Sequence, residues 1–142
     1  RALIVSNLVT VHQKAGIGCL SAYCGVISAG CGAGAGITYL HGGKFHAIAH
    51  TIVNAVAINS GMICDGAKEG CANKVALSAG LAVEAACLAM EGSGIHAQDG
   101  ILDDSFDRLI AHLGELVCVG MGSTNDTIVH IMKDEKMRRP DC

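Results

Sequence analysis

The stretch from Ser60 to Cys71 combines the residue types in this chain that are most able to do chemistry. It holds two thiols, Cys64 and Cys71, together with three charged side chains, and it lies between two long apolar segments. Glycine is disfavoured inside helices, so the three glycines of the stretch predict a tight, non-helical connection. Thiolates, free backbone amides and a lysine in one loop indicate a site for an anion or a metal.

Three cysteines lie beside glycine-rich backbone, namely Cys24, Cys64 and Cys71, with Cys31 as a fourth candidate. The seven-residue step from Cys64 to Cys71 is too long for the Cys-x-x-Cys pair of a zinc ribbon, and there is no matching second pair. An iron–sulfur cluster accepts more varied spacing because its ligands can come from separate loops. Spacing alone leaves both a cluster site and purely structural thiols open.

A second glycine-rich feature is the run from Gly30 to Gly36. It does not match the dinucleotide fingerprint, which needs a third glycine at the right position after a strand, and no Gly-Lys-Ser/Thr follows as the Walker pattern requires. What remains is a helix surface almost without side chains. Another backbone, a cluster or a small substrate could approach such a surface closely.

The composition favours one all-α domain over residues 1–142. The chain is 51% hydrophobic but only 3% aromatic, with 19 Gly and one Pro, so its core must consist of small and branched aliphatic side chains. Such a core suits closely packed helices, and no stretch alternates convincingly with a period of two residues. We expect a compact bundle of about five or six helices with glycine-rich loops. Because the chain starts at Arg1 without a Met, we also expect a fragment of a longer protein or a processed chain.

The hydrophobic pattern places the helices at residues 2–14, 19–40, 44–59, 72–91, 103–115 and 127–136, with a turn at 120–126. The first helix is expected to be largely buried, with Leu3, Leu8 and Val11 near one face. Core stripes are expected in three later helices. They consist of Ile48, Ile52, Val56 and Asn59; of Val75, Ala79, Ala82 and Ala86; and of Phe106, Leu109, Ile110 and Leu113.

Two further side-chain types could bind metal but are better explained by packing. His46 and His50 lie four residues apart, as helical metal ligands do, but no Glu follows His46 as the zinc-protease motif requires. We expect these histidines to be surface or packed residues. Cys87 lies inside an alanine-rich helix, where a free cysteine acts as a small core residue.

Charge and cysteine usage exclude some classes of function. The net charge is −3 and the pI is about 6.1, so no overall basic field is present to hold nucleic acid. The basic cluster formed by Lys133, Lys136, Arg138 and Arg139 is mixed with acidic residues and predicts a solvated tail. Eight Cys could form a disulfide framework, but the ample apolar residues and the lack of a visible signal peptide favour a reduced, cytoplasmic protein.

Two apolar runs are long enough to span a bilayer. Residues 15–40 and 45–64 contain no Asp, Glu, Lys or Arg. The first is dominated by small residues and the second carries histidines and asparagines, and neither has flanking Trp or a clear positive-inside pattern. We therefore expect buried helices of a soluble core and no membrane contact, with a membrane helical module as the alternative.

A family resemblance rests on two segments. Residues 61–74, GMICDGAKEGCANK, and the preceding residues 28–36, SAGCGAGAG, resemble the C-terminal helical region of the iron–sulfur L-cysteine desulfidases, which are related to the α chain of iron–sulfur L-serine dehydratase. The resemblance covers nearly the whole chain. The 40-residue separation of Cys24 and Cys64 is also similar to that of two cluster cysteines in such desulfidases.

This resemblance implies a [4Fe–4S] cluster held by three protein thiolates, with one iron left open. Cys24 and Cys64 are the implied ligands, and the third thiolate would come from an N-terminal region outside this chain; Cys71 is a further candidate. The implied reaction is β-elimination of L-cysteine to pyruvate, ammonia and sulfide. Dehydration of L-serine is the nearest alternative, and a non-catalytic helical oligomerisation module is the alternative from another class.

The resemblance also directs attention to residues that could bind the substrate, a small amino acid. Its carboxylate could be held by the glycine-rich backbone at Gly32 and Gly34 or by the basic Lys68 and Lys74. Lys68 could instead be solvated or paired with a neighbouring acid in its own loop. No residue of the sequence stands out as a general base. We expect the intact protein to be a homo-oligomer.

Overall fold

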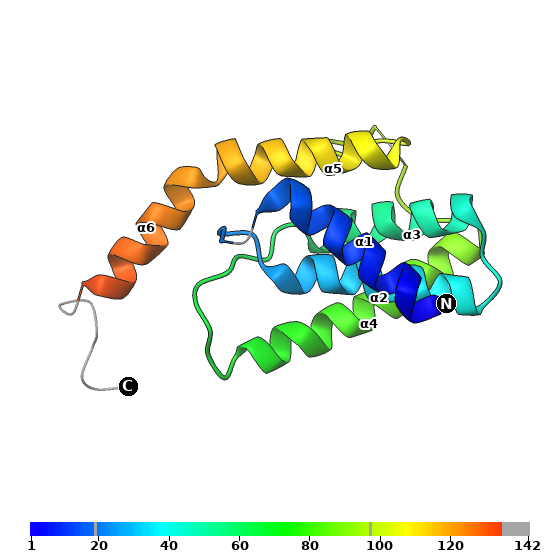
Figure 1. The fold of residues 1–142 in the computed structure, drawn as a ribbon, viewed down its shortest axis with the longest axis horizontal. Helices are drawn as coiled ribbons and strands as arrows, with labels where there is room; N and C mark the ends of the chain where they lie inside the picture. The colour runs from blue at the N-terminus through cyan, green and yellow to red at the C-terminus, as the bar shows by residue number, and fades with distance from the viewer. Residues whose placement is uncertain (19, 97, 135–142) are drawn as a thin grey trace.

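The computed structural model describes residues 1–18, 20–96 and 98–134, and every regular element within them is a helix (Figure 1). In chain order they are α1 (Ala2–Ile17), α2 (Gly25–Leu40), α3 (Phe45–Asn59), α4 (Cys71–Met90), α5 (Phe106–Glu115), the π-helical η1 (Leu116–Gly120) and α6 (Gly122–Lys133). The all-α fold class expected from the sequence is confirmed.

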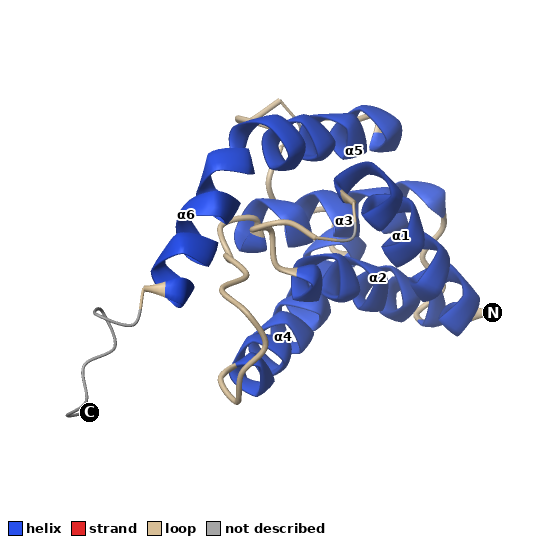
Figure 2. Cartoon of the chain, turned by 60° about the vertical axis from the view of Figure 1, so that its left-hand side comes forward, coloured by secondary structure: helices blue, strands red, loops and turns tan. Residues whose placement is uncertain are grey.

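Helix α2 is the centre of the bundle. It packs against α1, α3 and α4, as the two ribbon views show (Figures 1 and 2). A Cβ on Gly32 would lie 2.5 Å from the carbonyl oxygen of Ser6 on α1, and one on Gly34 would lie 3.1 Å from that of Ala82 on α4. The helices approach so closely that only glycine fits. The glycine-rich surface of α2 is therefore in contact with the backbone of neighbouring helices, and not with a cluster or a small substrate.

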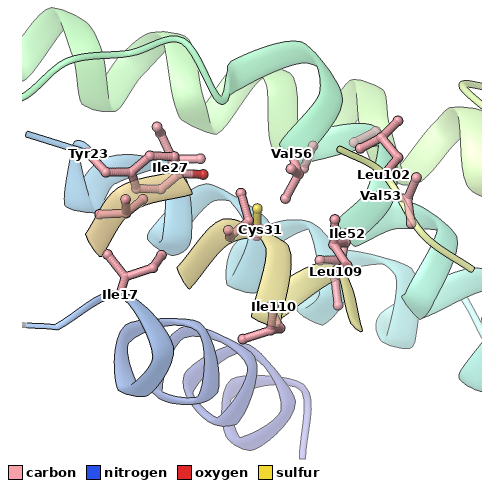
Figure 3. Packing of buried hydrophobic residues seen from close by; sticks show 14 of the residues in the cluster. Ile17, Tyr23, Ile27, Cys31, Ile52, Val53, Val56, Leu102, Leu109 and Ile110 are labelled. Atoms are coloured by element: carbon pink, nitrogen blue, oxygen red, sulfur yellow. The ribbon is translucent and has the colours of Figure 1, made fainter. Parts of the chain in front are cut away.

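The core lies between α2, α3 and α5 and is built from aliphatic side chains around the thiol of Cys31 (Figure 3). Leu109 and Leu113 of α5 are fully buried in it, as predicted. Helix α5 also starts where expected, because the Ser105 hydroxyl accepts a hydrogen bond from the amide of Arg108 at 3.5 Å. Burial raises the pKa of Cys31 to about 11, so this thiol stays neutral at physiological pH.

The prediction that α1 is largely buried was wrong. Leu3, Leu8 and Val11 are 79%, 63% and 64% exposed, whereas Gln13 and Ile17 on another side of the helix are buried. Apolar residues surround most of α1, so the local pattern does not select the face that meets α2. The face of α1 that meets α2 is set instead by the tertiary contact in which the α2 glycines allow the two helices to approach closely.

Two helix boundaries also differ from the prediction. Helix α2 begins at Gly25 rather than at residue 19, because residues 22–24 are extended and pair with residues 62–64; Cys19 itself lies outside the described residues. The predicted turn at 120–126 is instead helical. The amide of Met121 donates to the carbonyl of Leu116 at 2.9 Å, a π-helical bond that carries the chain from α5 into α6. The predicted helix end at residue 136, and with it most of the basic tail, lies outside the described residues.

Helix α4 packs on one side only. Ala82 and Ala86 of the predicted stripe are buried, but Val75 and Ala79 are exposed. Cys87, predicted as a core residue, is also exposed, so that prediction was wrong. The buried side passes through Ala85 and Ala89 instead. The α3 stripe, in contrast, is confirmed: Ile52, Val56 and Asn59 are buried, and Ile48 is partly buried against the same core.

The two apolar runs of the sequence are each interrupted in the structure. Helices α2 and α3 have 16 and 15 residues. Among the described residues, α4 is the one helix with the length and apolar composition to cross a membrane, and 22% of its most apolar stretch is buried within the structure.

Candidate functional site

The α3–α4 loop pairs with the extended segment that precedes α2. The amide of Cys24 donates to the carbonyl of Met62 at 3.1 Å, and the amide of Cys64 donates to that of Ala22 at 2.6 Å. These two hydrogen bonds flank an isolated antiparallel bridge between residues 23 and 63. Two segments that lie 40 residues apart in sequence therefore run side by side.

This pairing brings two of the predicted ligand cysteines together. Successive side chains of extended backbone point to opposite faces, so Cys24 and Cys64 share one face and Tyr23 and Ile63 share the other. Diagonal neighbours in an antiparallel pair have Cα atoms about 7–8 Å apart. Cys24 is buried, at 6% exposure, and Cys64 is partly buried. Both thiols are thus sheltered, and they lie on the same face of the paired segments.

Cys24 also occupies a special position in the backbone. Its φ and ψ of −67° and 125° are extended, and its carbonyl accepts the first hydrogen bond of α2, from the amide of Ile27 at 3.0 Å. It is therefore the N-cap residue of the central helix. The positive end of a helix dipole stabilises negative charge at such a position.

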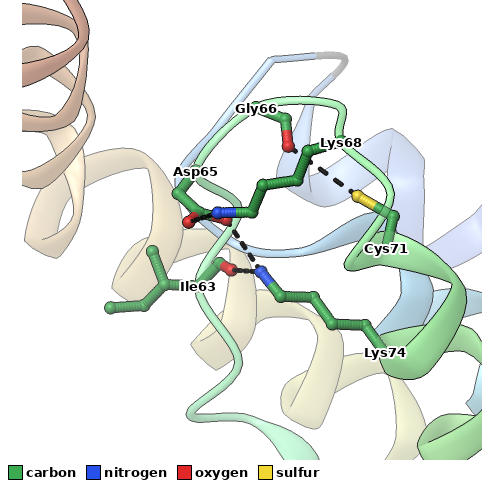
Figure 4. Close-up of polar contacts among 6 residues, drawn as sticks. All are labelled: Ile63, Asp65, Gly66, Lys68, Cys71 and Lys74. Carbon is green, nitrogen blue, oxygen red and sulfur yellow. Dashed lines mark hydrogen bonds and ion pairs between the residues drawn. The ribbon is translucent and has the colours of Figure 1, made fainter. Parts of the chain in front are cut away.

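The charged residues of the loop form one network around Asp65 (Figure 4). Lys68 and Lys74 both donate to its carboxylate, Lys74 at 2.9 Å, and Lys74 also donates to the carbonyl of Ile63 at 2.7 Å. These two lysines hold the pKa of Asp65 well below its usual range. The sequence left open whether Lys68 is paired with a neighbouring acid, and the structure shows the pair with Asp65.

Lys74 connects this network to the thiols. The hydrogen bond that Lys74 donates to Asp65 is the main cause of the raised pKa of Lys74, and Coulombic interaction with Cys24 and Cys71 raises it further. The network of Asp65, Lys68 and Lys74 contains one carboxylate and two ammonium groups and so carries one net positive charge. The network is exposed enough for a ligand to reach, with Lys68 and Lys74 side chains 52% and 25% exposed.

The remaining candidate cysteines are placed differently. Cys71 is the first residue of α4, and its thiol donates to the carbonyl of Gly66 at 3.7 Å within the same loop. Cys31 is a neutral core thiol rather than a loop residue. In the part of the chain that the structure describes, no three His, Cys, Asp or Glu side chains are grouped so that they could hold a metal ion. Cys24, Cys64 and Cys71 therefore do not form a closed three-ligand site by themselves.

The predicted substrate residues fall into two groups. Lys68 and Lys74 lie beside the cysteine loop. Gly32 and Gly34 are buried in contacts of α2 with α1 and α4, where helix backbone fills the space in front of them. The structure therefore does not bring these two glycines to the surface that the lysines share.

A cleft of about 550 Å³ adjoins the charged network. The α3–α4 loop and the first turn of α4 form one wall, and α6 forms the other. Its lining residues are Met62, Ile63, Asp65, Lys74, Ser123, Thr124, Thr127 and Ile128. The sequence did not reveal the hydroxyl residues of α6 as part of a site, because the first two lie in a stretch that predicts a turn. Their spacing was the available signal, since residues 123, 124 and 127 lie close together on a helix surface.

A separate cavity of about 550 Å³ lies between α3 and the α4–α5 connection and includes His46, His50 and His96 in its lining. His46 is exposed, and the Nε2 atom of His50 lies 3.4 Å from the carbonyl oxygen of Ile95. This arrangement fits the expectation of surface and packed histidines.

The fold and the paired cysteine segments define an all-α domain with a solvent-accessible loop site, and comparison with known proteins places it in a family. The chain belongs to the serine dehydratase alpha chain family, a family of lyases, whose model matches residues 1–130. No solved structure matches the chain.

Curated relatives cover nearly all of this chain. A UPF0597 protein of Desulfitobacterium hafniense is 52% identical over 95% of the chain, and one of Lachnoclostridium phytofermentans is 48% identical over 93%. The matched part is 31% and 32% of those two proteins. The chain thus spans about a third of the length of the relatives that it matches.

Proposed function

We propose that this chain is the cluster-binding part of an iron–sulfur lyase that converts L-cysteine to pyruvate, ammonia and sulfide. The observation that carries the proposal is the pairing of residues 22–24 with residues 62–64, which sets Cys24 and Cys64 on one face of the backbone. Membership of the serine dehydratase alpha chain family supports lyase chemistry at this site.

The donor set fits part of an iron–sulfur site. Cysteine thiolates are the usual ligands of such clusters, and Cys24 and Cys64 supply two of them from sheltered positions. The third thiolate comes from Cys71 or from a part of the longer polypeptide outside this chain. When bound, a [4Fe–4S] cluster with one open iron supplies a Lewis acid for the leaving group.

The residues of this chain hold the substrate in place. Lys68 and Lys74 bind its carboxylate: Lys74 lines the cleft, and Lys68 is held beside it by their shared partner Asp65. The reaction removes the α-proton and expels the sulfur of the β-carbon as hydrosulfide, which creates a carbon–carbon double bond. The resulting aminoacrylate takes up water and releases ammonia, which gives pyruvate.

L-Serine is a second candidate substrate because the family model is that of the serine dehydratase alpha chain. The bond changes are the same, except that water rather than hydrogen sulfide leaves from the β-carbon. The leaving group therefore distinguishes the two substrates.

Anaerobic reconstitution of the full-length protein with iron and sulfide tests the proposal. We expect cluster absorbance, together with pyruvate and sulfide from L-cysteine at a higher kcat/KM than pyruvate from L-serine. Cys24→Ser and Cys64→Ser should each lose most of the bound iron and the activity. Cys87→Ser, which changes an exposed thiol on α4, is the matched control and should retain both.

Three outcomes would contradict parts of this proposal. Absence of cluster absorbance and of turnover would overturn the assignment as an enzyme. Unchanged iron content and activity in Cys24→Ser and Cys64→Ser would favour a non-catalytic helical oligomerisation module. A preference for L-serine would reverse the order of the two substrates. In a separate experiment, loss of bound iron in Cys71→Ser would show that the third thiolate comes from this chain, and unchanged iron content would show that it does not.

A further inference from the structure

Helix α6 forms one wall of the cleft although it is held only loosely by the rest of the chain. None of its residues is buried, and it follows the π-helical η1 rather than a packed turn. Its approach to the cysteine loop is close at one point. A Cβ on Gly66, whose φ is +94°, would lie 2.9 Å from the terminal methyl of Met132. The position of α6 thus owes little to an apolar core of its own.

The cleft presents hydrogen-bond donors from both walls. The ammonium group of Lys74 has three N–H bonds, and Asp65 and Ile63 accept two of them. On the opposite wall, the hydroxyls of Ser123 and Thr124 make no hydrogen bond within the described residues. The hydroxyl of Thr127 donates to the carbonyl of Ser123 at 2.8 Å and keeps its lone pairs free to accept.

These free donors are complementary to a carboxylate. A carboxylate has two oxygens with about four acceptor positions, and bonds to it from an ammonium group are stronger than bonds between neutral groups. The rest of the lining consists of Met62, Ile63 and Ile128, which suit a short carbon chain, and of Asp65. The carboxylate of Asp65 is already paired with Lys68 and Lys74. The volume of about 550 Å³ lies within the range of small-molecule sites.

We propose that Ser123 and Thr124 of α6, together with Lys74 of α4, form the carboxylate subsite of this cleft. The ligand is a small α-amino acid or a small α-keto acid such as pyruvate, and both carry this carboxylate. The assignment of the amino acid as substrate and of the keto acid as product rests on the proposed function. A carboxylate bound between the two walls connects α6 to the cysteine loop. Ligand binding therefore protects the amides of α6 from hydrogen exchange.

The test uses the full-length protein without iron and two unreactive ligands, L-alanine and pyruvate. L-Alanine has the amino acid carboxylate but no leaving group on its β-carbon, and pyruvate has the carboxylate of the product. We expect both ligands to raise the Tm of the unmodified protein and to slow hydrogen exchange in α6. The double variant Ser123→Ala with Thr124→Val should lose both effects, whereas its Tm without ligand stays the same.

A matched control removes a hydroxyl elsewhere. Ser93→Ala changes an exposed residue beyond the far end of α4 and should respond to ligand like the unmodified protein. In the iron-loaded enzyme, the double variant should raise the KM for L-cysteine roughly tenfold with little change in kcat, since the lost hydrogen bonds are present in both ground and transition states.

The outcomes separate this inference from the proposed function. A ligand response in the double variant equal to that of the unmodified protein would overturn the subsite, and so would a lack of response to both ligands in the unmodified protein. A response to one ligand alone supports the subsite and identifies it with substrate or with product. If the unmodified protein shows no turnover but does respond to the ligands, the proposed lyase activity would be refuted and the carboxylate subsite would still be supported.

Discussion

Helices α2 and α6 are opposites in how they are held, although both lie close to the cysteine loop. Nine of the 16 residues of α2 are buried, and none of the 12 residues of α6 is. In the ribbon views α2 is enclosed by other helices, whereas α6 extends from the body at the end of α5 (Figures 1 and 2). The site therefore has a rigid side, which positions Cys24, and a loosely held side, which can adjust to a ligand.

The largest expected effect is at the rigid side. Gly32→Ala places a Cβ 2.5 Å from a backbone oxygen of α1, which can move only if the helices separate. We expect a loss of about 3 kcal/mol in the free energy of unfolding, measured by denaturant titration. Gly80→Ala on α4 is the control. No heavy atom lies within 4 Å of the added methyl group, so a gain of about 0.5–1 kcal/mol is expected. Equal effects of the two variants would contradict the close packing of α2.

The second prediction concerns the buried thiol of α2. Because the folded-state pKa of Cys31 is raised to about 11, its contribution is fully present below the unfolded-state pKa of about 8.5 and is lost as pH rises toward 11. Unfolding followed across this range should show a loss of about 3 kcal/mol from this residue. Cys31→Ala should remove that part of the pH dependence, and Cys87→Ala, at an exposed thiol, should retain it.

A smaller effect is expected at the charged network between the two sides. Asp65→Asn removes the negative charge that holds Lys68 and Lys74, so trypsin should cleave more rapidly after Lys68 while the Tm changes little. Glu69→Gln is the control in the same loop. The pKa of Asp65 is depressed, so its contribution is fully present above the usual pKa of an aspartate and is lost progressively as pH falls from that value toward the depressed pKa. Loosening of the loop already at pH 4 in the unmodified protein would contradict this network.

The smallest effect is expected on α6. Val129→Ala, at a side chain that is 38% exposed, should change the free energy of unfolding by less than about 0.5 kcal/mol. Without ligand, the amides of α6 should exchange with deuterium faster than those of α2, because little apolar contact protects them. Equal protection of the amides of α2 and α6 would contradict the conclusion that α6 is held more loosely than α2.

Several features of this protein could be read from local sequence because local physics decides them. The glycines of residues 60–71 end α3 and delay α4, and Ser105 caps α5. The α3 stripe through Ile52 and Val56 has helical periodicity and is buried. The exposed face of α1 could not be read in this way, since its apolar residues surround most of the helix. The helical state of residues 122–126 could not be predicted from local sequence either, because their polar and hydroxyl side chains are equally typical of a turn.

The sequence by itself determined the all-α class, the glycine-rich loop and the residue types that could serve a cluster and a carboxylate. Only the tertiary structure decided which of them meet. The pairing of Cys24 with Met62 and of Cys64 with Ala22 joins segments 40 residues apart, and no local periodicity encodes such a contact. The same reason explains why Gly32 and Gly34 are buried against helices while Ser123 and Thr124 line the cleft. A residue's type limits its chemistry, but the packing of distant segments decides which surface it faces.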